Sequence, residues 1–112
     1  MKHLGRIALA LLLFVGVMKP TNVHPLPKIT GSSTQVQLST VAISCKWIQV
    51  IAPSGNTNSV FFGDSTTSAT VGLPIAPGGG YNTPTCDSCT YVLSGAYVYV
   101  SSGDSAYVAY GQ

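Results

Sequence analysis

Few side chains beyond residue 30 are suited to acid–base or nucleophilic chemistry. General acid–base catalysis needs a positioned His, Glu, Asp or Lys whose pKa suits the reaction. Residues 31–112 contain no His, Arg or Glu, and their charged side chains are Lys46, Asp64, Asp87 and Asp104. An active site would have to be built almost entirely from these four, with Lys46, Asp64 and Asp104 as the cluster to consider. We therefore predict a non-enzymatic protein with no catalytic residues and no cofactor.

The surroundings of Asp64 and Asp104 are typical of turns. Each follows a glycine and precedes a serine. Glycine supplies a positive φ, and an Asp carboxylate accepts hydrogen bonds from nearby backbone N–H groups. The spacing of the acidic residues does not match an EF-hand loop. We interpret both as turn residues, and we predict no metal site.

Three cysteines, Cys45, Cys86 and Cys89, allow one intramolecular disulfide at most. The C-x-x-C spacing of Cys86 and Cys89 fits a loop disulfide in an oxidising compartment, two free thiols, or half of a metal site. A zinc site would need a fourth ligand, which residues 31–112 could supply only as Asp or water. The sequence leaves these alternatives open, with the Cys86–Cys89 disulfide as first choice. Cys45, within an apolar run, is predicted to be buried.

The distribution of basic side chains excludes nucleic acid as a partner. Four of the five Lys and Arg residues precede residue 31, and only Lys46 follows. Proteins that bind nucleic acids take much of their affinity from Lys and Arg at the phosphates. We expect a protein partner instead.

The first 18 residues have the pattern of an export leader. Lys2 and Arg6 precede a twelve-residue apolar run at 7–18, which is shorter than the roughly 20 residues of a membrane-spanning helix. We therefore predict no stable membrane span. Three interpretations stay open: a cleaved signal peptide, an uncleaved anchor, and a start-codon artefact in which Met18 begins the chain. In each of them residues 1–18 stay outside the folded domain.

Residues 19–34 contain three prolines and no hydrophobic periodicity, which favours an extended linker. His24 is predicted to be solvated there, because no second ligand stands at metal-binding spacing. A single domain is then predicted over residues 35–112.

Short alternating or β-branched runs, separated by turn residues, indicate an all-β domain. The predicted strands are 35–39, 41–52, 59–63, an exposed edge strand at 65–71, an edge segment at 73–77, and 96–100 and 106–110. The last two flank a loop at 101–105 and predict a β-hairpin. With no amphipathic helix, this set indicates a small antiparallel β-sandwich or jelly-roll-like domain.

Alternation within the strands indicates which side chains meet a partner. Both faces of 41–52 are largely apolar, which predicts a central strand covered on two sides. Tyr97 and Tyr99 share one face of their strand, and we expect that face to be partly exposed. Exposed aromatic side chains on a sheet favour association. The candidate interface residues are Trp47, Tyr97, Tyr99 and Tyr107.

Several sequence patterns occur together between residues 35 and 111. They are Trp-x-Gln at 47–49, Val-x-x-Gly-Asp at 60–64, Gly-Leu-Pro-Ile-Ala-Pro-Gly at 72–78, and Tyr-Val-Tyr at 97–99 with Gly-Asp at 103–104. In this order they resemble small phage-encoded β-sandwich proteins that are virion structural or head-associated components. The resemblance implies a non-enzymatic protein that binds a capsid or another virion surface, forms a homo-oligomer and assembles in the host cytoplasm.

The leader and the C-x-x-C pair support an alternative. In this hypothesis the protein is an exported or surface-tethered binding module that holds a carbohydrate or a protein against its exposed aromatic side chains. It predicts export and a Cys86–Cys89 disulfide, whereas the first hypothesis predicts the chain in the virion.

Overall fold

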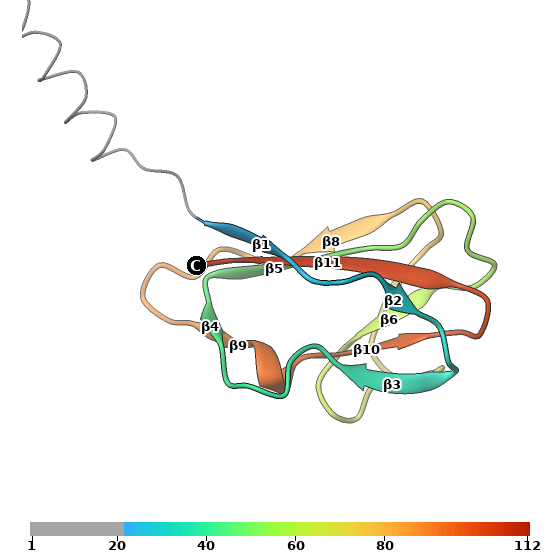
Figure 1. Cartoon of the computed structure of the whole chain (residues 1–112), viewed down its shortest axis with the longest axis horizontal. Helices are drawn as coiled ribbons and strands as arrows, with labels where there is room; N and C mark the ends of the chain where they lie inside the picture. Colours follow the sequence, from blue (N-terminus) through green and yellow to red (C-terminus); the bar gives the residue numbers. More distant parts are fainter. Residues whose placement is uncertain (1–21) are drawn as a thin grey trace, which may run out of the picture.

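The computed structural model describes residues 22–112, which form an all-β domain (Figure 1). Every strand pairing among these residues is antiparallel. The predicted all-β class is therefore confirmed, while the leader predicted at 1–18 lies outside the described residues. Within 22–112 no helix is long and apolar enough to cross a membrane.

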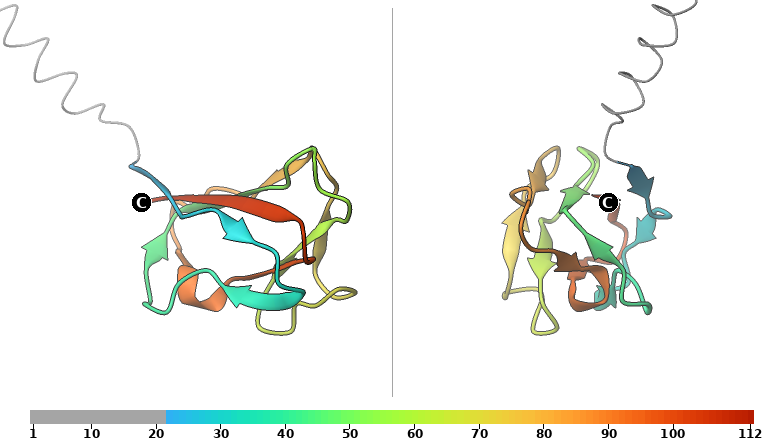
Figure 2. Two further views of the ribbon diagram at one scale, coloured as in Figure 1. Left: turned by 45° about the vertical axis from the view of Figure 1, so that its right-hand side comes forward. Right: turned by 90° about the vertical axis from the view of Figure 1, so that its left-hand side faces the viewer.

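Two larger sheets and one short strand pair make up the domain (Figures 1 and 2). The five-stranded sheet has the order β1 (Val23–Pro25), β11 (Ser105–Gly111), β5 (Trp47–Ile51) and β8 (Gly80–Asn82), and β2 (Ile29–Thr30) also pairs with β11. The four-stranded sheet has the order β3 (Thr34–Gln37), β10 (Tyr97–Val100), β6 (Val60–Gly63) and β7 (Leu73–Ile75). The short pair is β4 (Ser44–Cys45) with β9 (Tyr91–Val92), and a 3₁₀ turn, η1 (Leu93–Gly95), follows it.

The core lies between the two larger sheets. Successive side chains of a strand point to opposite faces, so alternate residues enter it. The fully buried members from β5, β6, β10 and β11 are Ile48, Val50, Val60, Val98, Val100 and Ala106, and Leu93 joins them from η1. Each large aliphatic side chain buried in this way contributes about 1.5–3 kcal/mol relative to its exposed state.

The linker prediction is wrong for residues 23–30. β1 pairs with β11 from Val23 to Pro25, and β2 pairs with the other half of β11. Between them, the Leu26 N–H donates to the Val108 carbonyl at 2.8 Å. Proline has no N–H group and cannot donate a hydrogen bond to a neighbouring strand. On an edge strand this costs no hydrogen bond where the N–H would point to solvent, so prolines are tolerated here.

The hairpin predicted around 101–105 is also wrong. β10 lies in the four-stranded sheet and β11 in the five-stranded sheet, so the intervening turn carries the chain from one sheet to the other. Both runs alternate and both place valines in the core. Alternation therefore predicted the two strands correctly and could not tell a hairpin from a sheet-to-sheet crossing.

The edge strand predicted at 65–71 is a series of bends and turns. The Thr67 N–H and hydroxyl both donate to the Asp64 carbonyl, at 3.0 and 2.6 Å, and the Ser68 N–H donates to the Val71 carbonyl at 2.9 Å. Local bonds of this kind compete with a ladder, which explains why a Thr-rich run does not join the sheet.

The sequence predicted that His24 is solvated, and in the structure its side chain is only partly exposed. Its ring stacks on that of Tyr110, its cross-strand partner, with centroids 5.1 Å apart and planes 23° from parallel. The Nε2 atom is buried and has no hydrogen-bond partner among residues 22–112. His24 therefore holds β1 against β11 with its ring but leaves one polar atom unsatisfied.

A His24→Phe substitution should raise the free energy of unfolding by about 1 kcal/mol, since an unsatisfied buried polar atom costs about that much or more. Phenylalanine keeps the stacking on Tyr110 and removes the buried nitrogen. Urea denaturation of both proteins measures the difference. His24→Ala is the control and should lower stability, because it removes the stacked ring. A phenylalanine variant less stable than the parent would show that Nε2 is satisfied in solution.

Candidate functional site

The outer face of the five-stranded sheet carries the largest group of exposed apolar side chains on any single sheet face. In register, Tyr107 lies opposite Ile51, Ala109 opposite Gln49, and Gly111 opposite Trp47. All of these point away from the core. We name this surface the Trp47–Tyr107 face, and its members are Val23, Pro25, Trp47, Gln49, Ile51, Asn82, Tyr107 and Ala109.

The Trp47 side chain packs against Gly111 of the neighbouring strand β11. A Cβ atom added to Gly111 would overlap Nε1 and Cε2 of the Trp47 indole. The indole therefore occupies the space in which a side chain at position 111 would stand. Only glycine opposite Trp47 permits this arrangement, which fixes the ring across β5 and β11.

Tyr107 and its cross-strand neighbour Ile51 form the other end of the face. Tyr107 is 45% exposed and Ile51 is 40% exposed. Tyr107 lies four positions along β11 from Gly111, the residue opposite Trp47, which corresponds to about 13 Å along the strand. Two aromatic rings thus stand on one rigid sheet at a fixed separation.

Two shallow hollows lie between and beside these rings. One, of about 130 Å³, is lined by Pro25, Gln49, Ile51, Tyr107 and Ala109 of the face, with Leu26 and Val108. The other, of about 230 Å³, is lined by Trp47, Gln49, Asn82, Thr83 and Thr85. Gln49 belongs to both, and the amides of Gln49 and Asn82 supply both hydrogen-bond donors and acceptors there.

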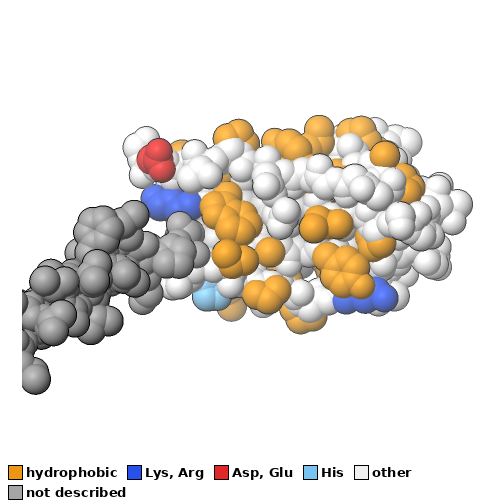
Figure 3. Space-filling model, turned by 90° about the horizontal axis from the view of Figure 1, so that it is seen from above, with side chains coloured by type: hydrophobic (Ala, Val, Ile, Leu, Met, Phe, Trp, Pro, Cys, Tyr) orange, Lys and Arg blue, Asp and Glu red, His pale blue; other side chains and the backbone are white. Residues whose placement is uncertain are grey.

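Figure 3 shows this side of the molecule, with hydrophobic side chains spread across it and basic groups only at its margins. The central strand β5 was predicted to be covered on both faces. Its inner face, with Ile48 and Val50, is fully buried, whereas on its outer face Trp47 and Gln49 are half-buried and Ile51 is exposed. That prediction is wrong for the outer face, which is the candidate binding surface.

The four predicted interface aromatics do not lie together. Trp47 and Tyr107 belong to the Trp47–Tyr107 face, whereas Tyr97 and Tyr99 lie on the outer face of the four-stranded sheet. There Tyr99 lies between Gln35 of β3 and Phe61 of β6. Both tyrosines are half-buried, and their valine neighbours fill the core, as the alternation predicted.

The loop after β6 lies close to the face that carries Tyr97 and Tyr99. With its amide nitrogen turned toward the loop, Gln35 donates to the carbonyls of Ser65 at 2.8 Å and Thr67 at 3.2 Å. Thr67 is buried, and a Cβ atom on Gly63 would stand 2.8 Å from its hydroxyl oxygen. This face is therefore partly occupied from within the domain, which leaves the Trp47–Tyr107 face as the better candidate.

The polar residues considered for catalysis are bound to different loops. Asp104 accepts hydrogen bonds from the N–H groups of Thr57 at 2.8 Å and Asn58 at 2.9 Å. Asp64 accepts bonds from the hydroxyl and the N–H of Thr66, and these bonds lower the pKa of its carboxyl group. Asp64 thus binds a backbone N–H group of its own turn, as its surroundings predicted, whereas Asp104 lies in its predicted turn but binds N–H groups of a distant loop.

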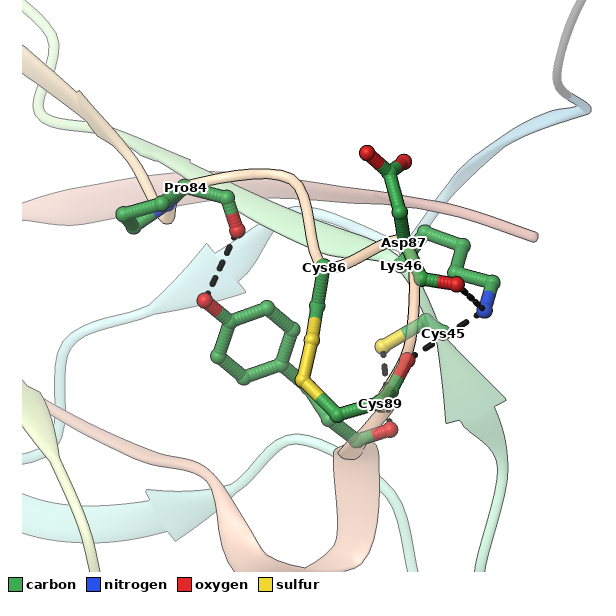
Figure 4. Close-up of a disulfide and its surroundings, with 7 residues drawn as sticks. Cys45, Lys46, Pro84, Cys86, Asp87 and Cys89 are labelled. Atoms are coloured by element: carbon green, nitrogen blue, oxygen red, sulfur yellow. Dashed lines mark hydrogen bonds between the residues drawn. A yellow bond between two sulfur atoms is a disulfide. The ribbon is translucent and has the colours of Figure 1, made fainter.

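Lys46 contacts neither of these carboxylates. Its ammonium group donates to the carbonyls of Asp87 at 3.4 Å and Cys89 at 3.2 Å (Figure 4). In the same region Cys86 and Cys89 are joined as a disulfide, with Cα atoms 5.3 Å apart, which is within the usual range. Cys45 is buried as a free thiol, and burial raises its pKa.

Within residues 22–112, no group of three or more His, Cys, Asp or Glu side chains is arranged to hold a metal ion. Comparison with family models, with curated proteins and with solved structures found no match.

Sequence reasoning missed Val23, Pro25 and Ile51 of the Trp47–Tyr107 face. The first two fell within the predicted linker. Ile51 shares the period-2 alternation of Trp47 and Gln49, so the signal for it was present once one face of this strand was known to be open.

Proposed function

We propose that this chain is a non-enzymatic structural protein that docks on a protein surface through the Trp47–Tyr107 face, as a component of a phage virion. The observation that carries the proposal is the face itself, a sheet surface on which Ile51 and Tyr107 are exposed and Trp47 is half-buried. The sequence patterns from 47 to 104 that resemble virion structural proteins supply the assembly to which it would belong.

The composition of the face suits a protein partner. Interface cores are depleted of charge and enriched in aromatic side chains, and Trp and Tyr are frequent among the residues that dominate binding energy. No Lys, Arg, Asp or Glu is among the members of the face. Gln49 and Asn82 add polar groups that can pair with a partner's backbone. A second copy of the chain or another capsid component would bury the same surface.

The Gly103-Asp104 turn has a structural role in the domain. Asp104 joins the turn before β11 to the loop at 57–58, and the Asn56 amide both donates to the Ser105 carbonyl at 2.7 Å and accepts from the Ser105 N–H at 3.0 Å. These residues hold two loops together at one end of the domain. Their use as structural ligands supports a function that depends on shape rather than on acid–base chemistry.

Paired substitutions on the two outer faces test the proposal. Trp47→Ser with Tyr107→Ser should weaken self-association of the full chain by about 30-fold or more, since the loss of even one such residue can cost about 2 kcal/mol. Sedimentation equilibrium over a range of concentrations measures the change. Tyr97→Ser with Tyr99→Ser is the matched control on the opposite face and should leave association within about threefold of the parent.

Two results would count against this function. One is a parent chain that stays monomeric at all concentrations and is absent, by mass spectrometry, from virions of the phage that encodes it. The other is equal weakening by both pairs of substitutions, which would point to a loss of folding. Circular dichroism of each variant separates that case from a loss of binding.

The Cys86–Cys89 disulfide favours a second candidate function. Disulfides persist in oxidising compartments, so the disulfide supports an exported module that uses the same face to bind a carbohydrate or a protein. Intact masses of the chain from cytoplasmic and exported fractions, with and without reduction, separate the two functions. A shortened, oxidised chain outside the membrane supports export, and a reduced chain in the cytoplasm supports the virion component.

A further inference from the structure

The segment between β8 and β9 forms an exposed loop closed by a disulfide. Cys86 is half-buried, whereas Asp87, Ser88 and Cys89 are exposed. The disulfide joins residues three positions apart. We name residues 84–89 the disulfide loop; Figure 4 shows it beside Lys46.

Lys46 is the main attachment of this loop to the sheet. The Cys86 N–H donates to the Lys46 carbonyl at 3.0 Å, and the Lys46 ammonium donates to the carbonyls of Asp87 and Cys89 on the other side of the disulfide. Tyr91 adds a bond from its hydroxyl to the Pro84 carbonyl at 2.7 Å. The two bonds of the ammonium are exposed and measure 3.4 and 3.2 Å, so they are weak when they act alone.

The disulfide loop also borders the Trp47–Tyr107 face. Thr85, directly before Cys86, lines the hollow beside Trp47 together with Thr83. Thr83 is fixed to β5, since its N–H donates to the Ile48 carbonyl at 2.9 Å and its hydroxyl accepts from the Ile48 N–H at 2.8 Å. Thr85 lies between Pro84, whose carbonyl accepts from the Tyr91 hydroxyl, and Cys86, whose N–H donates to the Lys46 carbonyl and whose sulfur is joined to Cys89.

A disulfide between residues so close in the chain stabilises mainly its own loop. The stabilisation expected from loop closure grows with the number of residues enclosed, and here that number is small. Exposed disulfides are the ones that thiol reductants reach and that serve regulatory roles. Reduction should therefore loosen the disulfide loop and leave the two sheets intact.

We propose that the Cys86–Cys89 disulfide is a redox-sensitive latch that sets the shape of the hollow beside Trp47. Its effect on binding rests on the proposed function, whereas its effect on the hollow does not. A dithiol reductant attacks the exposed Cys89 sulfur as a thiolate, the S–S bond breaks, and Cys86 leaves as a thiolate that takes up a proton. The second thiol of the reductant then releases Cys89 as a thiol, and the reductant becomes a disulfide. Cys45 takes no part, since its thiol is buried.

The single tryptophan of the chain reports directly on the latch. In the full oxidised chain, reduction with dithiothreitol should increase acrylamide quenching of Trp47 fluorescence about twofold and speed hydrogen exchange in residues 84–89, as expected for a loosened surface loop. Mass spectrometry confirms that two hydrogens have been gained. The Cys86→Ser, Cys89→Ser variant should match the reduced parent under both conditions. The control variant Cys45→Ala should respond to reduction as the parent does.

Unchanged quenching and exchange after complete reduction would overturn the latch, whatever the chain binds. Failure of the proposed function has a different signature: Trp47→Ser with Tyr107→Ser would leave association unchanged while the reduction-dependent exchange at 84–89 persisted. A latch that controls docking predicts one more result, which is at least a threefold difference in association constant between the oxidised and reduced parent. An equal constant in both states would confine the latch to the hollow and reject its control of docking.

Discussion

Replacing Asp104 with alanine is expected to lower the free energy of unfolding by about 3 kcal/mol, the largest effect we expect from any charged residue. The Asp104 side chain is 6% exposed and accepts bonds from the N–H groups of Thr57 and Asn58. A hydrogen bond to a charged group contributes about 1.5–3 kcal/mol, and both would be lost. Chemical denaturation followed by circular dichroism measures the change.

Two controls make the Asp104 prediction specific. Asp104→Asn keeps one good acceptor and should cost about half as much as the alanine variant. Asp64→Ala removes a carboxylate from a similar Gly-Asp-Ser sequence, but one that is exposed and bonds only to its own loop. It should have the smallest effect of the three. An alanine variant at 104 as stable as the parent would show that the bonds to Thr57 and Asn58 are not formed in solution.

A second large effect is expected at Leu93, which the structure buries completely in η1. Leu93→Ala should cost about 3 kcal/mol, since large-to-small substitutions in a core remove apolar contacts and leave a cavity. Its N–H also donates to the Ile43 carbonyl at 2.8 Å, and that bond should survive the substitution. Thermal or urea unfolding gives the difference directly.

Val92 provides the matched control for Leu93. It is the preceding residue in the chain, and its side chain is 45% exposed. Val92→Ala should change stability by no more than about 0.5 kcal/mol, as is usual for surface positions. Similar losses at both positions would mean that η1 packs differently in solution.

The strands whose side chains alternate could be predicted from the sequence, because one pattern decides both the strand and its inner face. Val98 and Val100 of β10 are buried as the alternation requires. In β5 both faces are apolar, so the pattern predicted the strand but did not say that Ile48 and Val50 form its inner face. The turn roles of Asp64 and Asp104 also followed from their neighbours in the chain.

What the sequence could not predict depends on contacts between distant residues. The crossing from β10 to β11 is fixed by Asp104 and its partners Thr57 and Asn58, which lie 47 and 46 residues earlier in the chain. Nothing in the sequence around Gly111 indicates that a side chain there would be excluded; this follows only from the strand register, which places Trp47 opposite it. No local pattern reveals either pairing.

The sequence predicted which types of side chain form the candidate site, but it did not predict how they are arranged. Trp47 and Tyr107 were both identified, yet Tyr97 and Tyr99 were grouped with them although they belong to the other sheet. Alternation assigns a side chain to one face of its own strand. It does not say which sheet that strand joins, and so it cannot separate two aromatic pairs on opposite sides of a sandwich.

The position of β11 sets the order in which the domain can be completed during synthesis. β11 follows every other described strand in the chain, yet it lies between β1 and β5 and also pairs with β2 (Figure 1). The ribosome must therefore release Ser105–Gly111 before the larger sheet can close, and until then β1, β2 and β5 lack the strand that joins them. Pairing between segments far apart in the chain slows folding, because the entropy of closing the long loop is lost before the stabilising contacts form. A nascent chain that ends before residue 105 would expose unpaired strand edges, so we expect such incomplete chains to be prone to aggregation.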